Sequence, residues 1–195
     1  MKYLAFKPTL SLLLICALTV LSGCSSIVAN THKGTLVENE GVRTWGSLID
    51  DGVIESKAKI NILNSNPIMR QARVRAISYN GILLLVGQIP NPTLSDVAIT
   101  AVKGIRHVKS VESQLEVAPN ITLTRKAKDS YLAGRIKVAI SRNTDITVNR
   151  VKAIVDNGNV YLMGLVNKQE AQLAVSAVSQ VPGIVKIVKV FEYLD

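Results

Sequence analysis

Histidine and cysteine, the residues that most often bind metal ions or act as nucleophiles, are scarce in this chain of 195 residues, which has two of each. The histidines, His32 and His107, are far apart in the sequence and form no pair at the spacing of metal ligands. No Gly-rich phosphate loop, Gly-x-Ser-x-Gly turn or Cys/His pair occurs. The adjacent acids Asp50-Asp51 are typical of a helix cap rather than of an acid/base pair. We therefore expect a protein that is not an enzyme and that uses neither a metal ion nor a cofactor.

The N-terminus has the pattern of an export signal. Lys2 and Lys7 precede an apolar run, residues 10–21, with no acid among them. The run has about a dozen residues, whereas a membrane-spanning helix needs ~20. Small residues follow it in Leu21-Ser22-Gly23-Cys24, where a peptidase would cut. The pattern favours a cleaved signal peptide, residues 1–23, over an uncleaved anchor helix.

The segment Leu21-Ser22-Gly23-Cys24 resembles the bacterial lipobox. This resemblance implies that Cys24 becomes a diacylglyceryl cysteine whose amine is also acylated, for example with palmitate. Because each buried methylene contributes ~0.8 kcal/mol, several acyl chains would hold the protein firmly to a membrane. Ser25, which follows the anchor, implies sorting to the outer membrane. Since Cys16 would be removed and Cys24 consumed, no thiol would remain for a disulfide, a nucleophile or a metal site.

The balance of charge is basic. Removal of residues 1–23 takes away two lysines and no acid, which leaves 21 basic against 14 acidic side chains and a formal charge of +7. For an exported protein, the acidic partners within reach are phospholipid headgroups, lipopolysaccharide and cell-wall polymers. Nucleic acid is not among them, because it lies in the cytoplasm.

The rest of the chain contains an internal repeat. Asn80-Gly81 and Asn157-Gly158 lie 77 residues apart, and each precedes an apolar run that ends at Gly87 or Gly164. The residues before the first repeat unit show no sustained period of 2 or 3.6, which is typical of a flexible tether. We expect the following division: signal peptide 1–23, lipidated tether 24–45, first unit 46–117, linker 118–127 and second unit 128–195.

Each unit has the pattern helix, strand, strand, helix, strand. Asn-Gly between two apolar runs predicts a hairpin, because both residues accept the positive φ of a type I′ turn. In the second unit, Asp129 or Ser130 is expected to cap the first helix, and Asn167 with Glu170 forms a capping box for the second. The prediction is an α+β fold in which each unit has a three-stranded mixed sheet and two helices.

Each unit alone is small, and its stability would be marginal. A unit of about 70 residues buries only some 60% of its unfolded surface. We therefore expect the two copies to dock on each other. Trp45 and Tyr79, in the first unit, are expected to be packing residues.

The whole pattern resembles the BON domain, which occurs in bacterial osmotic-stress and outer-membrane proteins. The resemblance is carried by the hairpin glycines and by three segments, Val86-Gly87-Gln88, Leu162-Met163-Gly164-Leu165-Val166 and Val181-Pro182-Gly183-Ile184-Val185. A lipobox, a tether and two BON copies are similar to the dual BON-domain outer-membrane lipoproteins. The resemblance implies a protein that faces the periplasm, binds anionic phospholipid through its second BON domain, enriches at division sites and supports envelope integrity.

In that family, lipid contact is attributed to the first helix of the second BON domain. The matching positions here are Tyr131, Leu132, Arg135, Ile136 and Lys137. Where a member of the family begins this helix with tryptophan, this chain has Tyr131, and Ala133 and Gly134 stand where threonines follow. Both rings suit a membrane interface, but tyrosine inserts less apolar area.

The residues themselves also point to an acidic surface. Residues 125–142 contain six basic side chains and one acid, Asp129. With Leu132, Ile136 and Ile140 turned inward, a separate stripe carries an aromatic ring, an apolar side chain and two arginines, as interfacial insertion requires. The candidate phospholipid-binding residues are Tyr131, Leu132, Arg135, Lys137, Val138 and Arg142.

Two other interpretations of this helix remain open. A basic helix face can simply be solvated, and Tyr131 can pack as a hydrophobic staple against Arg135 or the other unit. The main hypothesis is binding of anionic phospholipid such as phosphatidylglycerol or cardiolipin. The alternative is a non-enzymatic periplasmic scaffold that binds an envelope-assembly protein or a cell-wall polyanion.

Overall fold

The computed structural model describes residues 43–194, apart from the side chain of Val148. The predicted signal peptide, Cys24 and nearly all of the predicted tether lie outside the described residues. The first repeat consists of α3 (Trp45–Ser65), η1 (Pro67–Arg70), β1 (Arg73–Tyr79), β2 (Ile82–Ile89), α4 (Thr93–Lys103) and β3 (Ser110–Val117). The second repeat consists of α5 (Leu123–Ser141), η2 (Val148–Arg150), β4 (Val151–Asp156), β5 (Asn159–Val166), α6 (Lys168–Ser179) and β6 (Lys186–Tyr193).

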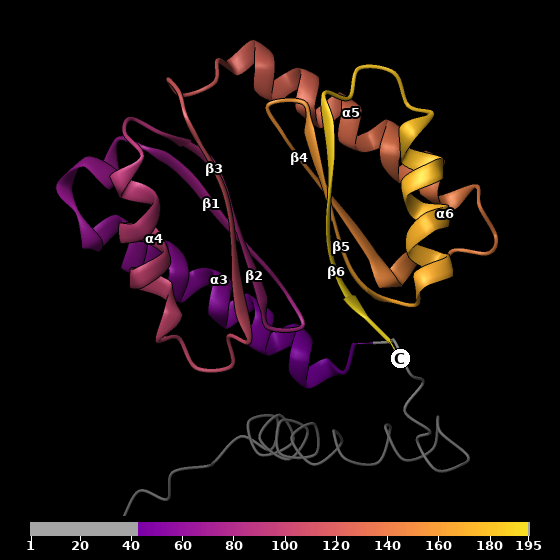
Figure 1. Ribbon diagram of the computed structural model, residues 1–195, viewed down its shortest axis with the longest axis horizontal. Coiled ribbons are helices and arrows are strands. Elements are labelled where there is room, and N and C mark those ends of the chain that lie inside the picture. The colour runs from indigo at the N-terminus through magenta and orange to yellow at the C-terminus, as the bar shows by residue number, and fades with distance from the viewer. Residues whose placement is uncertain (1–42, 195) are drawn as a thin grey trace, which may run out of the picture. The chain divides into compact units, whose positions relative to one another are not determined.

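Each repeat contains one mixed sheet. Its central strand has the hairpin partner on one side and the crossover strand on the other. The strand orders are β1-β2-β3 and β4-β5-β6. In each sheet the first pair is antiparallel and the second pair is parallel. A helix connects the parallel strands, as such a crossover requires. The predicted α+β fold, with three strands and two helices in each repeat, is confirmed (Figure 1).

The hairpins turn at the predicted Asn-Gly pairs. The φ angles are 51° and 81° at Asn80 and Gly81, and 50° and 76° at Asn157 and Gly158. Positive φ at both central residues is the signature of a type I′ turn, whose twist matches that of the flanking strands. Asparagine tolerates this region better than other residues with a side chain, and glycine has no Cβ to clash.

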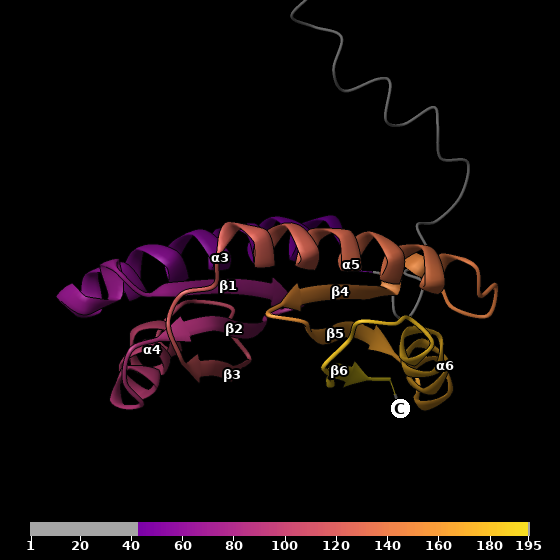
Figure 2. The ribbon, with the colours of Figure 1, turned by 90° about the horizontal axis from the view of Figure 1, so that it is seen from above.

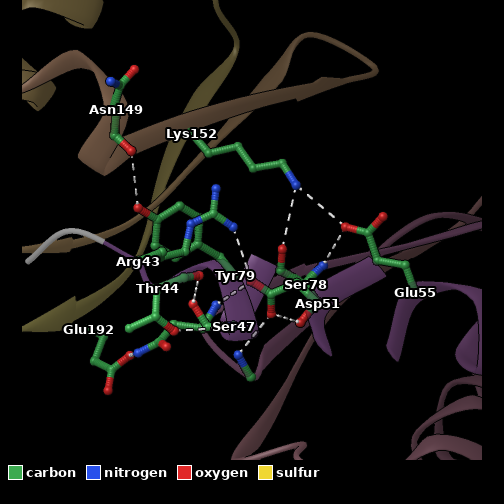
Figure 3. A network of polar contacts seen from close by, with 12 residues as sticks. Arg43, Thr44, Ser47, Asp51, Glu55, Ser78, Tyr79, Asn149, Lys152 and Glu192 are labelled. Atoms are coloured by element: carbon green, nitrogen blue, oxygen red, sulfur yellow. Dashed lines mark hydrogen bonds and ion pairs between the residues drawn. The ribbon is translucent and has the colours of Figure 1, made fainter. Parts of the chain in front are cut away.

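A buried carboxylate from α3 holds the first of these turns. Asp51 accepts hydrogen bonds from the N–H groups of Asn80 (2.9 Å) and Gly81 (3.0 Å) and from the hydroxyl of Ser78 (2.6 Å). The Arg43 guanidinium pairs with the same carboxylate at 3.0 Å (Figure 3). Asp51 therefore caps a hairpin turn. The helix cap that the sequence pattern predicted at Asp50-Asp51 is wrong, since the N-cap of α3 is Thr44.

The second repeat uses Asp129 in the same way, and this corrects the predicted start of its first helix. Asp129 accepts hydrogen bonds from the N–H groups of Asn157 (2.8 Å) and Gly158 (2.9 Å). The helix α5 begins earlier, at Leu123, where the side chain of Thr122 accepts a hydrogen bond from a backbone N–H. Its first two turns bury no apolar side chain, so hydrophobic periodicity gives no signal there.

The two repeats pack sheet against sheet. In each repeat, one face of the sheet is covered by its own two helices (Figures 1 and 2). The other face meets the sheet of the second copy in a shared apolar cluster, which confirms the expected docking. The buried members of this cluster are Ile77, Tyr79, Leu84, Val86, Ile154, Tyr161, Met163 and Val190.

Polar contacts at the rim of this interface reach from one repeat to the hairpin turn of the other. Glu192, near the end of β6, accepts a hydrogen bond from the side chain of Asn80 at 2.7 Å. Glu116, near the end of β3, accepts one from the side chain of Asn157 at 3.1 Å. Each turn is therefore held twice, through its backbone by its own first helix and through its asparagine side chain by the other repeat.

Of the two aromatic residues expected to pack, one does so. Tyr79 is buried between the sheets, and its hydroxyl donates to the carbonyl oxygen of Arg150 at 2.9 Å. Trp45 is 84% exposed, so its predicted packing role is wrong. Trp45 is the first residue of α3, and the buried face of this helix begins only at Asp51.

Two glycines with opposite surroundings provide a test of this fold. A Cβ at Gly164 would clash with the carbonyl oxygen of Arg150, the last residue of η2 just before β4, whereas a Cβ at Gly134, on α5, would meet nothing. Gly164→Ala is expected to lower the free energy of unfolding by about 1–3 kcal/mol, because the neighbouring strand must move. Gly134→Ala is expected to raise it by about 1 kcal/mol, because alanine favours the helix. Denaturant titration would measure both, and two changes of the same sign would contradict the structure.

The Asp51 carboxylate provides a second test. Burial alone would raise the pKa of Asp51, but hydrogen bonds from Ser78, Gly81, Asn80 and Arg43 outweigh burial and lower the pKa below the usual 3.8. Asp51→Asn should therefore cost about 1–3 kcal/mol of unfolding free energy near pH 7. A lowered folded pKa contributes stability above the unfolded pKa, and this contribution is lost as pH falls through the folded value.

The difference in stability between the wild type and Asp51→Asn should consequently shrink below about pH 4. Urea titrations of both proteins across this pH range would measure it. Asp50→Asn is the matched control, because Asp50 is more exposed and pairs with His107 at the surface, so its loss should cost under about 1 kcal/mol. Equal losses for Asp50→Asn and Asp51→Asn would contradict the role of Asp51.

Candidate functional site

The helix α5 turns one face to the core and the opposite face outward. Leu132, Ile136 and Ile140 recur at intervals of four residues and are buried among the strands and α6. Tyr131, one residue before Leu132, points about 100° away around the helix and is 70% exposed. Val138 lies on the same outward side and is 47% exposed. The described structure therefore leaves an aromatic ring and a branched apolar side chain in contact with solvent.

Four of the predicted residues line one shallow hollow between α5 and α6, with a volume of about 570 Å³. The Arg135 guanidinium carbon lies 5.9 Å from the centre of the Tyr131 ring, within the range of a cation–π contact. The same hollow is lined by Ala139 and, from the side of α6, by Ala177 and Val181. We call the four predicted residues the α5 ridge: Tyr131, Arg135, Val138 and Arg142.

The other two predicted residues do not belong to this hollow. Leu132 is only 7% exposed and packs in the core of the second repeat, so in the folded domain it supports α5 from beneath and cannot reach a membrane. Lys137 is exposed but lines a different hollow of about 500 Å³, which α5 shares with Arg43 and Tyr79 of the first repeat. The six predicted residues thus lie on three sides of α5. The four residues of the α5 ridge line the hollow beside α6, Lys137 lies on the other flank, and Leu132 lies on the buried face.

The charge on the outer surface of α5 is entirely positive. Its single acid, Asp129, is buried beneath the turn that it holds, and Arg125 lies 3.5 Å from its carboxylate. No ion pair within residues 43–194 involves the exposed cations of this helix and its C-cap, which are Lys126, Lys128, Arg135, Lys137 and Arg142. The hollow therefore lies in a field that attracts anions.

The role of Asp129 was missed by sequence reasoning. Its two hydrogen bonds to the β4–β5 turn hold the helix against the sheet and set the direction of the α5 ridge. A signal for it exists, because an aspartate stands 28 or 29 residues before Asn-Gly in both copies. Neither local propensity nor hydrophobic periodicity could show that these carboxylates reach the distant turns.

The described part of the chain offers little to other kinds of site. No cluster of three or more His, Cys, Asp or Glu in it could hold a metal ion. Among the helices between residues 43 and 194, none combines the length and the apolar character that crossing a bilayer requires.

Comparison with known proteins agrees with the fold and the repeat. The BON domain family matches residues 50–119 and 128–195, and this chain belongs to that family. The expected resemblance to dual BON-domain outer-membrane lipoproteins is also confirmed. The chain is 33% identical over 193 residues to Outer membrane lipoprotein DolP of Haemophilus influenzae, which covers 98% of this chain and 100% of that protein.

Two further similarities are more distant. The 21 kDa hemolysin of Actinobacillus pleuropneumoniae is 28% identical over 153 residues, which cover 78% of this chain and 79% of the hemolysin. Among solved structures, the C-terminal domain of CdsD, a structural protein of the type III secretion system of Chlamydia trachomatis, is 15% identical with a TM-score of 0.30. That comparison covers 74% of this chain and 67% of the CdsD chain.

The similarity to DolP supports an outer-membrane lipoprotein with a role in the cell envelope, and the family supports a binding protein rather than an enzyme. The helix α3 is the first helix of the first BON domain, and α5 is the first helix of the second.

Substitutions to alanine on α5 would separate its buried face from its exposed face. Leu132→Ala is expected to lower the free energy of unfolding by about 2–5 kcal/mol, because it leaves a cavity in the core. Val138→Ala removes a similar side chain from the surface and should change stability by no more than about 0.5 kcal/mol. Thermal or denaturant unfolding would measure both changes. A loss for Val138→Ala as large as that for Leu132→Ala would show that the α5 ridge is a packing surface.

Proposed function

We propose that this protein is anchored to the outer membrane by lipid at Cys24, faces the periplasm, and binds anionic phospholipid through the α5 ridge of its second BON domain. Phosphatidylglycerol and cardiolipin are the lipids whose charge suits this site. The proposal includes support of envelope integrity, with enrichment at division sites. The observation that carries the proposal is the α5 ridge itself, an exposed ring and an apolar side chain beside two arginines that form no ion pair within residues 43–194.

Each residue of the α5 ridge has a physical role in this proposal. The Tyr131 ring and Val138 enter the headgroup region, where an amphipathic ring is favoured. Arg135 and Arg142 meet lipid phosphates, to which a guanidinium can donate two parallel hydrogen bonds. Lys126, on the first turns of α5, adds to the attraction without entering the lipid.

The strength expected of such a contact is moderate. Each basic residue near an anionic leaflet contributes up to about 1 kcal/mol, and salt screens this attraction. Five exposed cations that form no ion pair within residues 43–194 are enough for peripheral binding, and the acyl chains at Cys24 would supply permanent attachment. The α5 ridge would then set how the domain is oriented on the membrane.

The proposal is tested by sedimentation with phosphatidylglycerol vesicles, using residues 24–195 with Cys24→Ser, so that neither acyl chains nor the apolar run of the predicted signal peptide plays a part. Tyr131→Glu should weaken uptake by roughly tenfold or more, because a ring is lost and a negative charge is placed at the membrane surface. Tyr193→Glu is the matched control, since it changes charge equally at another exposed tyrosine, on β6. Uptake of the control should equal that of the Cys24→Ser chain, and all uptake should fall as salt rises.

The arginines need a control of their own. Arg135→Gln should reduce uptake more than Arg70→Gln, because Arg70 is an exposed arginine on η1, far from α5 in the sequence. Equal effects of Tyr131→Glu and Tyr193→Glu, or no uptake at low salt, would contradict the proposal and favour the scaffold that binds an envelope-assembly protein. Retention on isolated cell wall that survives Tyr131→Glu, but not loss of the arginines, would instead indicate a cell-wall polyanion.

A further inference from the structure

The first BON domain exposes an apolar stripe of its own along α3. Trp45, Ile49, Val53 and Ile60 are all exposed, with Ile49 at 66%. At 3.6 residues per turn these four positions fall on one side of the helix, roughly opposite the buried Ile54, Ala58 and Ile62. The α3 stripe, as we call these four residues, extends for about 22 Å along the helix. Neither the core nor the interface between the domains covers it.

Each of the three acids of α3 has a partner, whereas its two lysines form no ion pair within residues 43–194. Asp50 pairs with His107 at 2.9 Å, Glu55 pairs with Lys152 at 3.4 Å, and Asp51 is buried under the hairpin turn. Lys57 and Lys59, which flank the α3 stripe on its two sides, are exposed, and no ion pair within residues 43–194 involves either of them. A row of apolar side chains that starts with tryptophan and has lysines on both flanks suits the surface of an anionic bilayer.

The position of α3 also suits such a surface. Trp45 follows Cys24 by 21 residues, and a chain of that length reaches at most about 70 Å. Figure 2 shows α3 and α5 in one layer along the same side of the two domains, next to the edge strands β1 and β4 and away from β3 and β6. Both helices therefore lie at the surface along the same side of the two domains.

We propose that the α3 stripe is a second phospholipid contact, so that this protein lies on the bilayer with one helix from each BON domain. This inference rests on the proposed membrane function. A second copy of the chain is a poorer occupant, because a stable interface usually involves about 20–30 residues on each side, and the α3 stripe offers four apolar side chains. On a membrane this small contact is sufficient, because it adds to those of the anchor and the α5 ridge.

The chain carries its own probe for this contact. Trp45 is its only tryptophan, so tryptophan fluorescence reports on the α3 stripe alone. On addition of phosphatidylglycerol vesicles to residues 24–195 with Cys24→Ser, the emission of Trp45 should shift to shorter wavelength. Lipids with brominated acyl chains should quench it, because the indole ring reaches the boundary between the headgroups and the acyl chains.

Ile49→Glu should abolish this shift and weaken vesicle uptake by roughly tenfold, because it replaces the neighbouring apolar side chain with a charge. The matched control is Ile68→Glu, at an isoleucine that is exposed on η1 and lies outside the α3 stripe. This control should keep both the shift and the uptake. Circular dichroism of the variants would show that each remains folded.

The possible outcomes separate this inference from the proposed function. Vesicle uptake that depends on Tyr131 without any change in Trp45 emission would overturn the second contact and leave the α5 ridge in place. Trp45 quenching that persists in Tyr131→Glu would support the α3 stripe even if the α5 ridge had no role. A shift that appears with rising protein concentration in the absence of vesicles would assign the α3 stripe to self-association and overturn the inference.

Discussion

The packing of one sheet against the other is the interaction on which the rest of this molecule depends. Each repeat has a sheet with two apolar faces, and its own two helices cover only one of them. The second face is kept from water only because the other copy lies on it, through side chains such as Leu84 and Met163. A single repeat would expose this face, and its stability would be marginal for its size. The duplication of the BON domain is therefore a structural requirement of this chain.

Docking of the sheets also decides which surfaces face outward. The two hairpin turns are held at the rim by Glu116 and Glu192 from the opposite repeat, and the aspartates of α3 and α5 hold the same turns from within. Because the inner face of each sheet packs against the inner face of the other, the first helices of both domains remain at the surface (Figure 2). The two apolar surfaces that face solvent on these helices, the α5 ridge and the α3 stripe, are consequences of this arrangement.

Much of the fold could be predicted from local patterns in the sequence. The Asn-Gly turns require positive φ, the capping box of α6 is a short motif, and the repeat spacing shows that the units are copies. What could not be predicted depends on contacts between distant segments. The start of α5 was placed too late because its first turns bury nothing apolar, and Trp45 was expected to pack although it precedes the core face of its helix. Leu132 was included in the site by family position, but helical geometry places it in the core.

The central functional claim is that the α5 ridge is free to touch phospholipid while the domains remain docked. Residue-resolved NMR of residues 24–195 with Cys24→Ser, titrated with phosphatidylglycerol, tests this most directly. Amide shifts should be largest at Tyr131, Arg135, Val138 and Arg142, and the amides of interface residues such as Leu84 and Met163 should not move. Shifts that are absent from α5, or that appear mainly between the sheets, would contradict the claim.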